Sequence, residues 1–177
     1  MKKQNEIFIW RITYSHVIAY FLAGLFALNF MNYKEQYASA SLSLLMKPVS
    51  DPIVALGPVL QIFRGVIIAL VLLPIKKAFI DERNGILKLA LLILGISSFS
   101  TIGPTPGSFD GIIYTILPIE YHLLGIPETV LYILLFCLFI WGSYKINRKY
   151  ISVISIVIIL LISIMGIMGF LYASHKI

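Results

Sequence analysis

The chain has 177 residues, of which 59% are hydrophobic and only 12% are charged, with a formal net charge of +6. Soluble domains are about half apolar and about a quarter charged, so this composition excludes an ordinary soluble domain and indicates a membrane protein. The basic residues lie in short clusters between long apolar runs, which is the pattern of membrane topology signals rather than of a nucleic-acid-binding surface.

The apolar runs predict one all-α integral membrane bundle that covers residues 1–177. Five helices are expected to cross the lipid bilayer, at about 7–30, 52–74, 85–102, 127–144 and 150–172. The first run follows Lys2 and Lys3, as the apolar part of a signal peptide would. The small residues ASA at 38–40 lie too far beyond it for a cleavage site, so we expect this run to remain as a spanning helix.

One face of the first predicted span carries small and polar residues. Ala19, Ala23 and Ala27 repeat every four positions, a spacing that lets another helix approach closely. His16 and Tyr20 continue the same face. We expect this face to pack inside the bundle, or to dock a partner subunit or a second copy of the chain.

Arg64 stands near the centre of the second predicted span. A charged side chain at that depth is costly unless it is paired or hydrated. Gln61, Gly57 and Gly65 share its helical face, and a small, polar face is expected to point into the bundle rather than at lipid.

The basic residues divide unequally between the two ends of a five-span bundle. The larger group is Lys2, Lys3, Arg11, Lys76, Lys77, Arg83, Lys88, Lys145, Arg148 and Lys149. The other end would hold only Lys34, Lys47 and Lys176. By the positive-inside rule, we predict a protein of the cell membrane with a cytoplasmic N-terminus, and with its C-terminus and residues 101–128 outside.

Residues 101–128 interrupt the apolar runs with prolines, glycines and carboxylates, and contain no Lys or Arg. The part at 111–125 is too short to cross a hydrocarbon core of about 30 Å as a helix. We predict that about 108–125 forms a re-entrant or interfacial helical segment, although a sixth crossing stays open. Because irregular backbone at membrane depth survives only in protein or beside a wet cavity, we expect an outward-facing polar cavity here.

This insert supplies the groups expected to meet Arg64. Asp110 and Glu120 are carboxylates that could pair with it, and Ser108 or Asp110 could cap a helix that begins at Gly111. Alternatively, Arg64 binds a carboxylate, a phosphate or a lipid headgroup, because its planar guanidinium suits bidentate anions. The candidate ligand-binding residues are Arg64, Gln61, His16, Ser108, Asp110, Tyr114, Glu120 and His122.

Histidines at two positions raise the question of a cofactor. His16 and His122 could ligate a haem, or a metal ion together with Glu120. The Glu120-x-His122 spacing puts the two side chains on different faces of a helix and lacks a further ligand. We therefore expect neither metal nor haem, and the sequence identifies no cofactor.

Three functions remain open at this stage. The first is binding or translocation of a small anionic or amphiphilic ligand, or of a lipid. The second is a non-catalytic membrane subunit of a larger complex. The third is an intramembrane enzyme acting on a lipid or isoprenoid headgroup, with Asp110, Glu120 or His122 as acid or base. No recognisable catalytic motif supports the third, so we expect a protein that is not an enzyme.

Overall fold

The computed structural model describes residues 2–99, 105–146 and 148–175. Four helices are long: α1 (Lys2–Phe30), α3 (Pro52–Leu72), α8 (Ile126–Lys145) and α9 (Arg148–Ser174). The shorter elements are α2 (Tyr33–Tyr37), η1 (Leu73–Ile75), α4 (Lys77–Ile80), α5 (Gly85–Leu94), η2 (Gly95–Phe99), α6 (Phe109–Tyr114) and α7 (Ile119–Leu124). No strand occurs within these described ranges.

The predicted all-α membrane bundle is confirmed. Four helical segments are long and apolar enough to span a membrane: Lys2–Phe30, Pro52–Ile75, Ile119–Lys145 and Tyr150–Ser174. The remaining predicted span, 85–102, contains a shorter apolar helix that ends in the π-helical turn η2. Its last predicted residues, 100–102, lie outside the described part of the chain.

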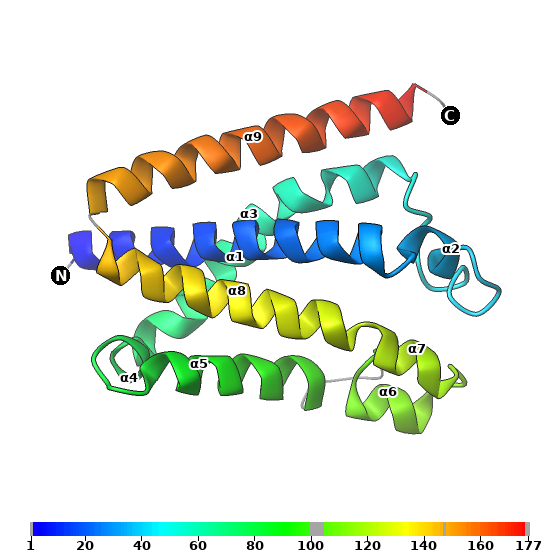
Figure 1. The fold of residues 1–177 in the computed structure, drawn as a ribbon, viewed down its shortest axis with the longest axis horizontal. Helices are drawn as coiled ribbons and strands as arrows, with labels where there is room; N and C mark the ends of the chain where they lie inside the picture. The colour runs from blue at the N-terminus through cyan, green and yellow to red at the C-terminus, as the bar shows by residue number, and fades with distance from the viewer. Residues whose placement is uncertain (1, 100–104, 147, 176–177) are drawn as a thin grey trace.

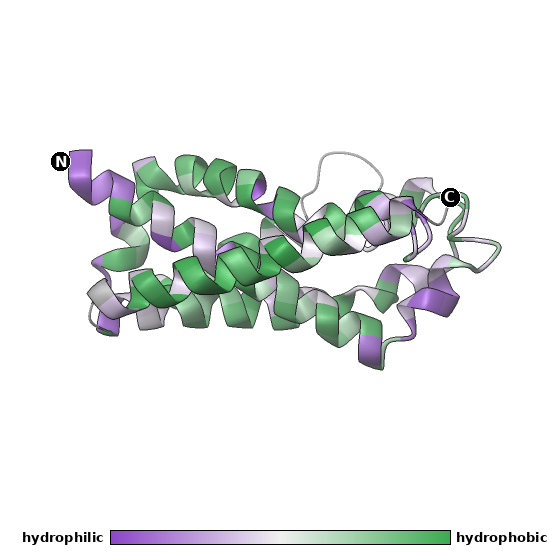
Figure 2. Cartoon of the chain, turned by 90° about the horizontal axis from the view of Figure 1, so that it is seen from above, coloured by the Kyte–Doolittle hydropathy of each residue, from purple (hydrophilic) through white to green (hydrophobic). Residues whose placement is uncertain are grey.

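The long helices lie side by side, with α1 between α3 and α8 (Figure 1). Helix α9 packs on α3, and α5 packs on α8. The N-terminus, α4 and the turn between α8 and α9 lie at one end of the bundle, which we call the basic end. Helices α2, α6 and α7 lie at the other, the insert end (Figure 1). Hydrophobic residues dominate the helices between these ends (Figure 2).

Helix α1 packs through its predicted face of small residues. Ala19, Ala23 and Ala27 are all at most 1% exposed, because each lies against other helices of the same chain. Of the two interpretations of this face, the structure therefore favours packing inside the bundle over docking to a partner.

Glycines allow α3 to approach both of its neighbours. A Cβ atom at Gly65 would lie 3.1 Å from the Cα of Thr13 on α1. On its other side, α3 meets α9, where a Cβ at Gly166 would lie 2.8 Å from Val59 Cγ2. These close approaches leave no room for larger side chains, so the glycines fix the spacing of three helices.

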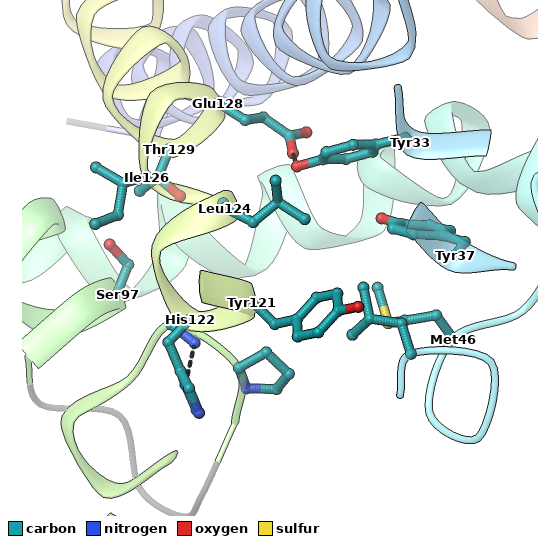
Figure 3. A pocket seen from close by; sticks show the side chains of 14 residues that line it. Tyr33, Tyr37, Met46, Ser97, Tyr121, His122, Leu124, Ile126, Glu128 and Thr129 are labelled. Carbon is teal, nitrogen blue, oxygen red and sulfur yellow. Dashed lines mark hydrogen bonds between the residues drawn. The ribbon is translucent and has the colours of Figure 1, made fainter. Parts of the chain in front are cut away.

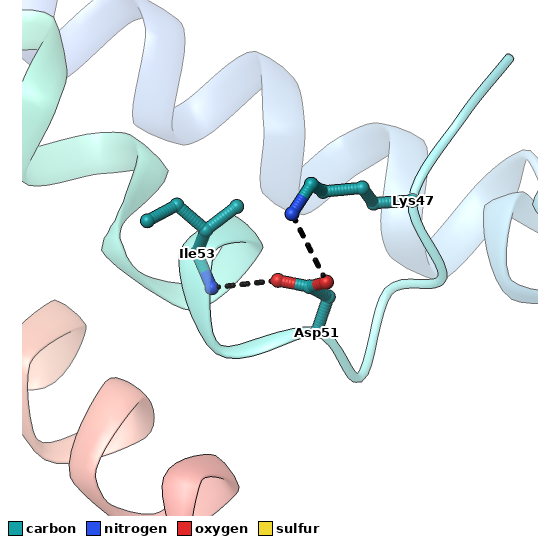
Figure 4. Close-up of polar contacts among 3 residues, drawn as sticks. All are labelled: Lys47, Asp51 and Ile53. Carbon is teal, nitrogen blue, oxygen red and sulfur yellow. Dashed lines mark hydrogen bonds and ion pairs between the residues drawn. The ribbon is translucent and has the colours of Figure 1, made fainter.

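The linker before α3 ends in a well-defined cap. The carboxylate of Asp51 accepts a hydrogen bond of 2.9 Å from the backbone N–H of Ile53, and Lys47 pairs with it at 3.3 Å (Figure 4). Pro52 follows in the first turn of the helix, where its missing N–H is not needed. Helix α3 thus begins at Pro52, where the second predicted span also begins.

Substitution at Gly65 tests the close approach of α1 and α3. We expect Gly65→Leu to lower the free energy of unfolding by on the order of 1–3 kcal/mol, because the added side chain meets the backbone of Thr13. Gly57→Leu on the same helix is the control, since its Cβ has no atom within 4 Å. Thermal unfolding in detergent measures both, and equal midpoints for the two variants would contradict the packing.

Candidate functional site

Three helices are joined in the middle of the bundle by His16. Its Nδ1 lies 2.7 Å from the hydroxyl of Tyr132 on α8, and its Nε2 lies 3.0 Å from Oε1 of Gln61 on α3. Because an amide oxygen only accepts, Nε2 carries the proton and Nδ1 accepts from the tyrosine. The ring is 1% exposed, so both of its nitrogens are satisfied by protein groups away from solvent.

Arg64 lies almost one helical turn beyond Gln61 on α3, and its side chain is exposed. Its charge acts electrostatically on His16, Tyr20 and Tyr132. The ion pairs found among the described residues are Lys47–Asp51 and Lys88–Glu82, and neither includes Arg64. The expected pair with Asp110 or Glu120 is therefore not formed within the described ranges.

A series of polar side chains leads from Arg64 toward the insert end. Tyr20 interacts electrostatically with both Arg64 and Glu128. The carboxylate of Glu128 accepts a hydrogen bond of 2.5 Å from the hydroxyl of Tyr33 on α2. The ring of Tyr33 stacks on Tyr37, with centroids 5.1 Å apart. These residues come from α1, α2, α3 and α8, so tertiary packing alone brings them together.

A pocket of about 230 Å³ opens where α2, α7 and α8 meet (Figure 3). Its polar and aromatic lining includes Tyr33, Tyr37, Tyr121, His122 and Glu128. Burial, together with the charge of Glu128, raises the pKa of Tyr37 to about 12 and also raises the pKa of Tyr33. Both phenols therefore stay protonated in ordinary conditions and present hydroxyl groups to the pocket.

His122 organises the insert from inside. Its Nδ1 accepts a hydrogen bond of 3.1 Å from the backbone N–H of Gly107, and its Nε2 lies 3.3 Å from the hydroxyl of Thr115. That hydroxyl donates to the carbonyl of Gly111, so Nε2 is the protonated nitrogen. The side chain is 2% exposed. It thus ties the loop before α6 and the segment after α6 to α7.

Ser108 caps α6, as the sequence suggests. Its hydroxyl oxygen accepts from the N–H of Gly111 at 2.9 Å and donates to the carbonyl of Thr105 at 2.7 Å. A Cβ at Gly111 would lie only 2.0 Å from that carbonyl oxygen, so the turn requires glycine. The N-terminus of α6 is therefore satisfied by the chain itself.

The predicted site residues do not form one site. His16, Gln61 and Arg64 lie together in the middle of the bundle, whereas Ser108 and His122 hold the insert. Asp110 is partly buried, and Glu120 is exposed. Tyr114 lines a different cavity, of about 750 Å³, between α6 and residues 40–46. Of the eight, only His122 lines the pocket at α2, α7 and α8.

Sequence reasoning missed several residues of the polar series. Tyr132 was not among the candidate residues, yet its hydroxyl binds His16 inside the bundle. Glu128 and its hydrogen-bond partner Tyr33 were not among the candidate residues either. The spacing of Glu128 and Tyr132, four residues apart on one helix, is the signal that could have indicated a polar face.

His16 and His122 use both ring nitrogens for bonds to different protein groups. Within the described ranges, no three His, Cys, Asp or Glu side chains gather as a metal site would require.

The chain matches no known family model, and no curated protein or solved structure is significantly similar to it. The fold thus defines the class, a polytopic helical membrane protein. Anything more specific has to be argued from the side chains just described.

Replacing His122 tests its role in the insert. We expect His122→Ala to raise the hydrogen-exchange rate of the Gly107 amide by about tenfold, because one hydrogen bond of typical net strength is lost. Hydrogen–deuterium exchange with mass spectrometry of the insert peptides measures this. His175→Ala, at an exposed histidine near the end of α9, serves as the control. Unchanged exchange at Gly107 in His122→Ala would show that the imidazole does not hold the loop.

Proposed function

We propose that this protein binds a small anionic or amphiphilic ligand, or a lipid, through Arg64, in the service of transport or lipid handling in the cell membrane. The observation that supports the proposal is an exposed guanidinium in the middle of a predicted span, without a carboxylate partner among the described residues.

The physical argument starts from the cost of the charge. A guanidinium at that depth is stable only with an anion, a polar cavity or water beside it. His16 hydrogen-bonds to both Gln61 and Tyr132, so the amide oxygen of Gln61 and the hydroxyl of Tyr132 are already engaged. An anionic group held in bidentate fashion would satisfy the donors of Arg64.

The route to Arg64 favours an amphiphile over a water-soluble anion. The carboxylate of Glu128 lies on the polar side that leads to the insert end, and its negative charge opposes the passage of an anion. The exposed side of α3 offers a second route, because a molecule already dissolved in the bilayer meets Arg64 directly. The insert would then border the site rather than contain it.

The alternative functions make different demands on the same residues. An enzyme would need Asp110, Glu120 or His122 to act with Arg64, and the described residues contain no hydrogen bond or ion pair that joins them. A subunit of a larger complex remains a second candidate, because an exposed Arg64 could pair with an acidic residue of a partner helix within the membrane.

Loss of the guanidinium tests the proposal. We expect native mass spectra of the gently extracted protein to contain a defined adduct that falls by about tenfold or more in Arg64→Ala, as the loss of charged hydrogen bonds implies. Arg64→Lys should keep part of the adduct, since the charge remains. Phe63→Ala is the matched control, because this neighbouring side chain is 70% exposed.

Two outcomes would contradict ligand binding at Arg64. In the first, the wild-type protein and folded Arg64→Ala both carry no adduct under the same conditions. This result would favour the partner-subunit candidate. The other is an adduct that survives in Arg64→Ala. Circular dichroism of each variant establishes that the bundle is folded.

We also propose that the basic end of the bundle faces the cytoplasm. Lys76, Lys77 and Lys145 lie there together with the N-terminus, whereas Lys34 lies in α2 and Lys47 pairs with Asp51 before α3, at the other end. This asymmetry follows the positive-inside rule. The insert and the pocket lined by Tyr33 and Glu128 would then face outward.

Cysteine labelling tests this orientation. Cys137 is buried, so Cys137→Ala provides a background without thiols into which single cysteines are placed. We expect a membrane-impermeant maleimide to label Ser50→Cys in intact cells, and to label Glu82→Cys only after permeabilisation. The reverse pattern would place the basic end outside.

A further inference from the structure

A second polar pocket lies at the basic end of the bundle, opposite the pocket of Tyr33 and Glu128. Its volume is about 370 Å³. Its charged and aromatic lining comes from three parts of the chain: Arg11 and Phe8 on α1, Lys76, Lys77 and Asp81 in and beside α4, and Tyr144 on α8. The pocket thus lies between helices, close to the ends of predicted spans.

Arg11 is the central group of this pocket. It is only 4% exposed, and its guanidinium carbon lies 4.0 Å from the ring centroid of Tyr144. The described residues offer Arg11 no hydrogen bond or ion pair. A guanidinium carries five N–H donors. Among the described residues, the fully enclosed side-chain atoms without a partner are Tyr14 Oη and Ser15 Oγ and include no nitrogen of Arg11, so its donors remain accessible from the pocket. The cation–π contact holds the group in place without using the donors in its plane.

The surrounding charges are predominantly positive. Lys76 is partly buried and donates to Oδ1 of Asn5 at 2.6 Å, whereas Lys77 is exposed. Asp81 is the acidic residue of the lining and is also exposed. Three basic side chains against one carboxylate leave the pocket with an excess of positive charge.

We propose that this pocket binds a phosphate group, as carried by the headgroup of an anionic phospholipid or by a small soluble phosphate compound. Arg11 would donate to the phosphate oxygens, and Lys76 and Lys77 would add charge from the side of α4. Basic pockets between spanning helices near the membrane surface are a recurrent way to bind anionic headgroups. The apolar side chains of Phe8 and Ile7 in the same lining suit the neighbouring glycerol and acyl groups.

This site is independent of the one proposed at Arg64. The two lie on different helices, and Arg64 lines neither this pocket nor the pocket of Tyr33 and Glu128. A phosphate site at Arg11 can therefore fail while ligand binding at Arg64 stands, and the reverse also holds.

The experiment uses the full chain in nanodiscs of equal phosphatidylglycerol and phosphatidylcholine, released into a native mass spectrometer. We expect phosphatidylglycerol to be retained in preference to phosphatidylcholine. Retention should fall by about fivefold for each basic charge removed, in Arg11→Gln and in Lys77→Gln. Lys88→Gln is the control, because Lys88 is exposed, lies at the same end of the bundle and is paired with Glu82.

A second arm separates the two sources of phosphate. Inorganic phosphate is added to delipidated protein, and the unfolding temperature is followed for wild type and Arg11→Gln. Saturable stabilisation of the wild type alone would identify a site for free phosphate, whereas selective retention of phosphatidylglycerol alone would identify a lipid headgroup.

The proposal is overturned if neither probe distinguishes the wild type from Arg11→Gln, that is, if phosphatidylcholine is retained equally and inorganic phosphate does not stabilise the wild type selectively. Arg11 also packs against Tyr144, so its replacement could simply unfold the bundle. The exposed Lys77 removes that ambiguity, because Lys77→Gln leaves the packing intact. If Lys77→Gln and a folded Arg11→Gln both retain phosphatidylglycerol like the wild type, and inorganic phosphate does not stabilise the wild type, the pocket has only a structural role.

Discussion

The structure depends on satisfying a few polar groups inside an otherwise apolar bundle. His16 does this at the centre, where its two ring nitrogens join α1 to α3 through Gln61 and to α8 through Tyr132. Apolar side chains pack with little preference for one register over another, and lipid is as good a neighbour for them as protein. The directional hydrogen bonds of His16, formed away from water, therefore determine the register of α1, α3 and α8.

Around this centre, small residues decide how closely the helices lie. The alanines of α1 and the glycines of α3 and α9 are located where backbones nearly touch. Their packing leaves Arg64 at the edge of the hydrogen-bonded centre rather than within it. A costly charge is thereby kept at a surface, where its donors are available to something other than this chain.

The two ends of the bundle have opposite chemistry. The insert end presents tyrosines, Glu128 and the loop before α6. His122 holds this loop by accepting a hydrogen bond from the backbone N–H of Gly107. The basic end presents Arg11 and two lysines around a pocket that one exposed carboxylate does not neutralise. The two ends of the bundle therefore differ in the charge that they present.

The sequence by itself determined the class of fold, the start of α3 at Asp51 and Pro52, and the cap by Ser108, because periodicity, composition and capping are local properties. It also singled out Arg64 and His16, since polar residues inside apolar runs can be recognised from the sequence alone. Only the tertiary structure decided that His16 meets Tyr132, that Glu128 meets Tyr33, and that Arg11 lines a pocket with Lys76. Each of these pairs joins segments far apart in the sequence, and no local pattern specifies which faces of two helices come together.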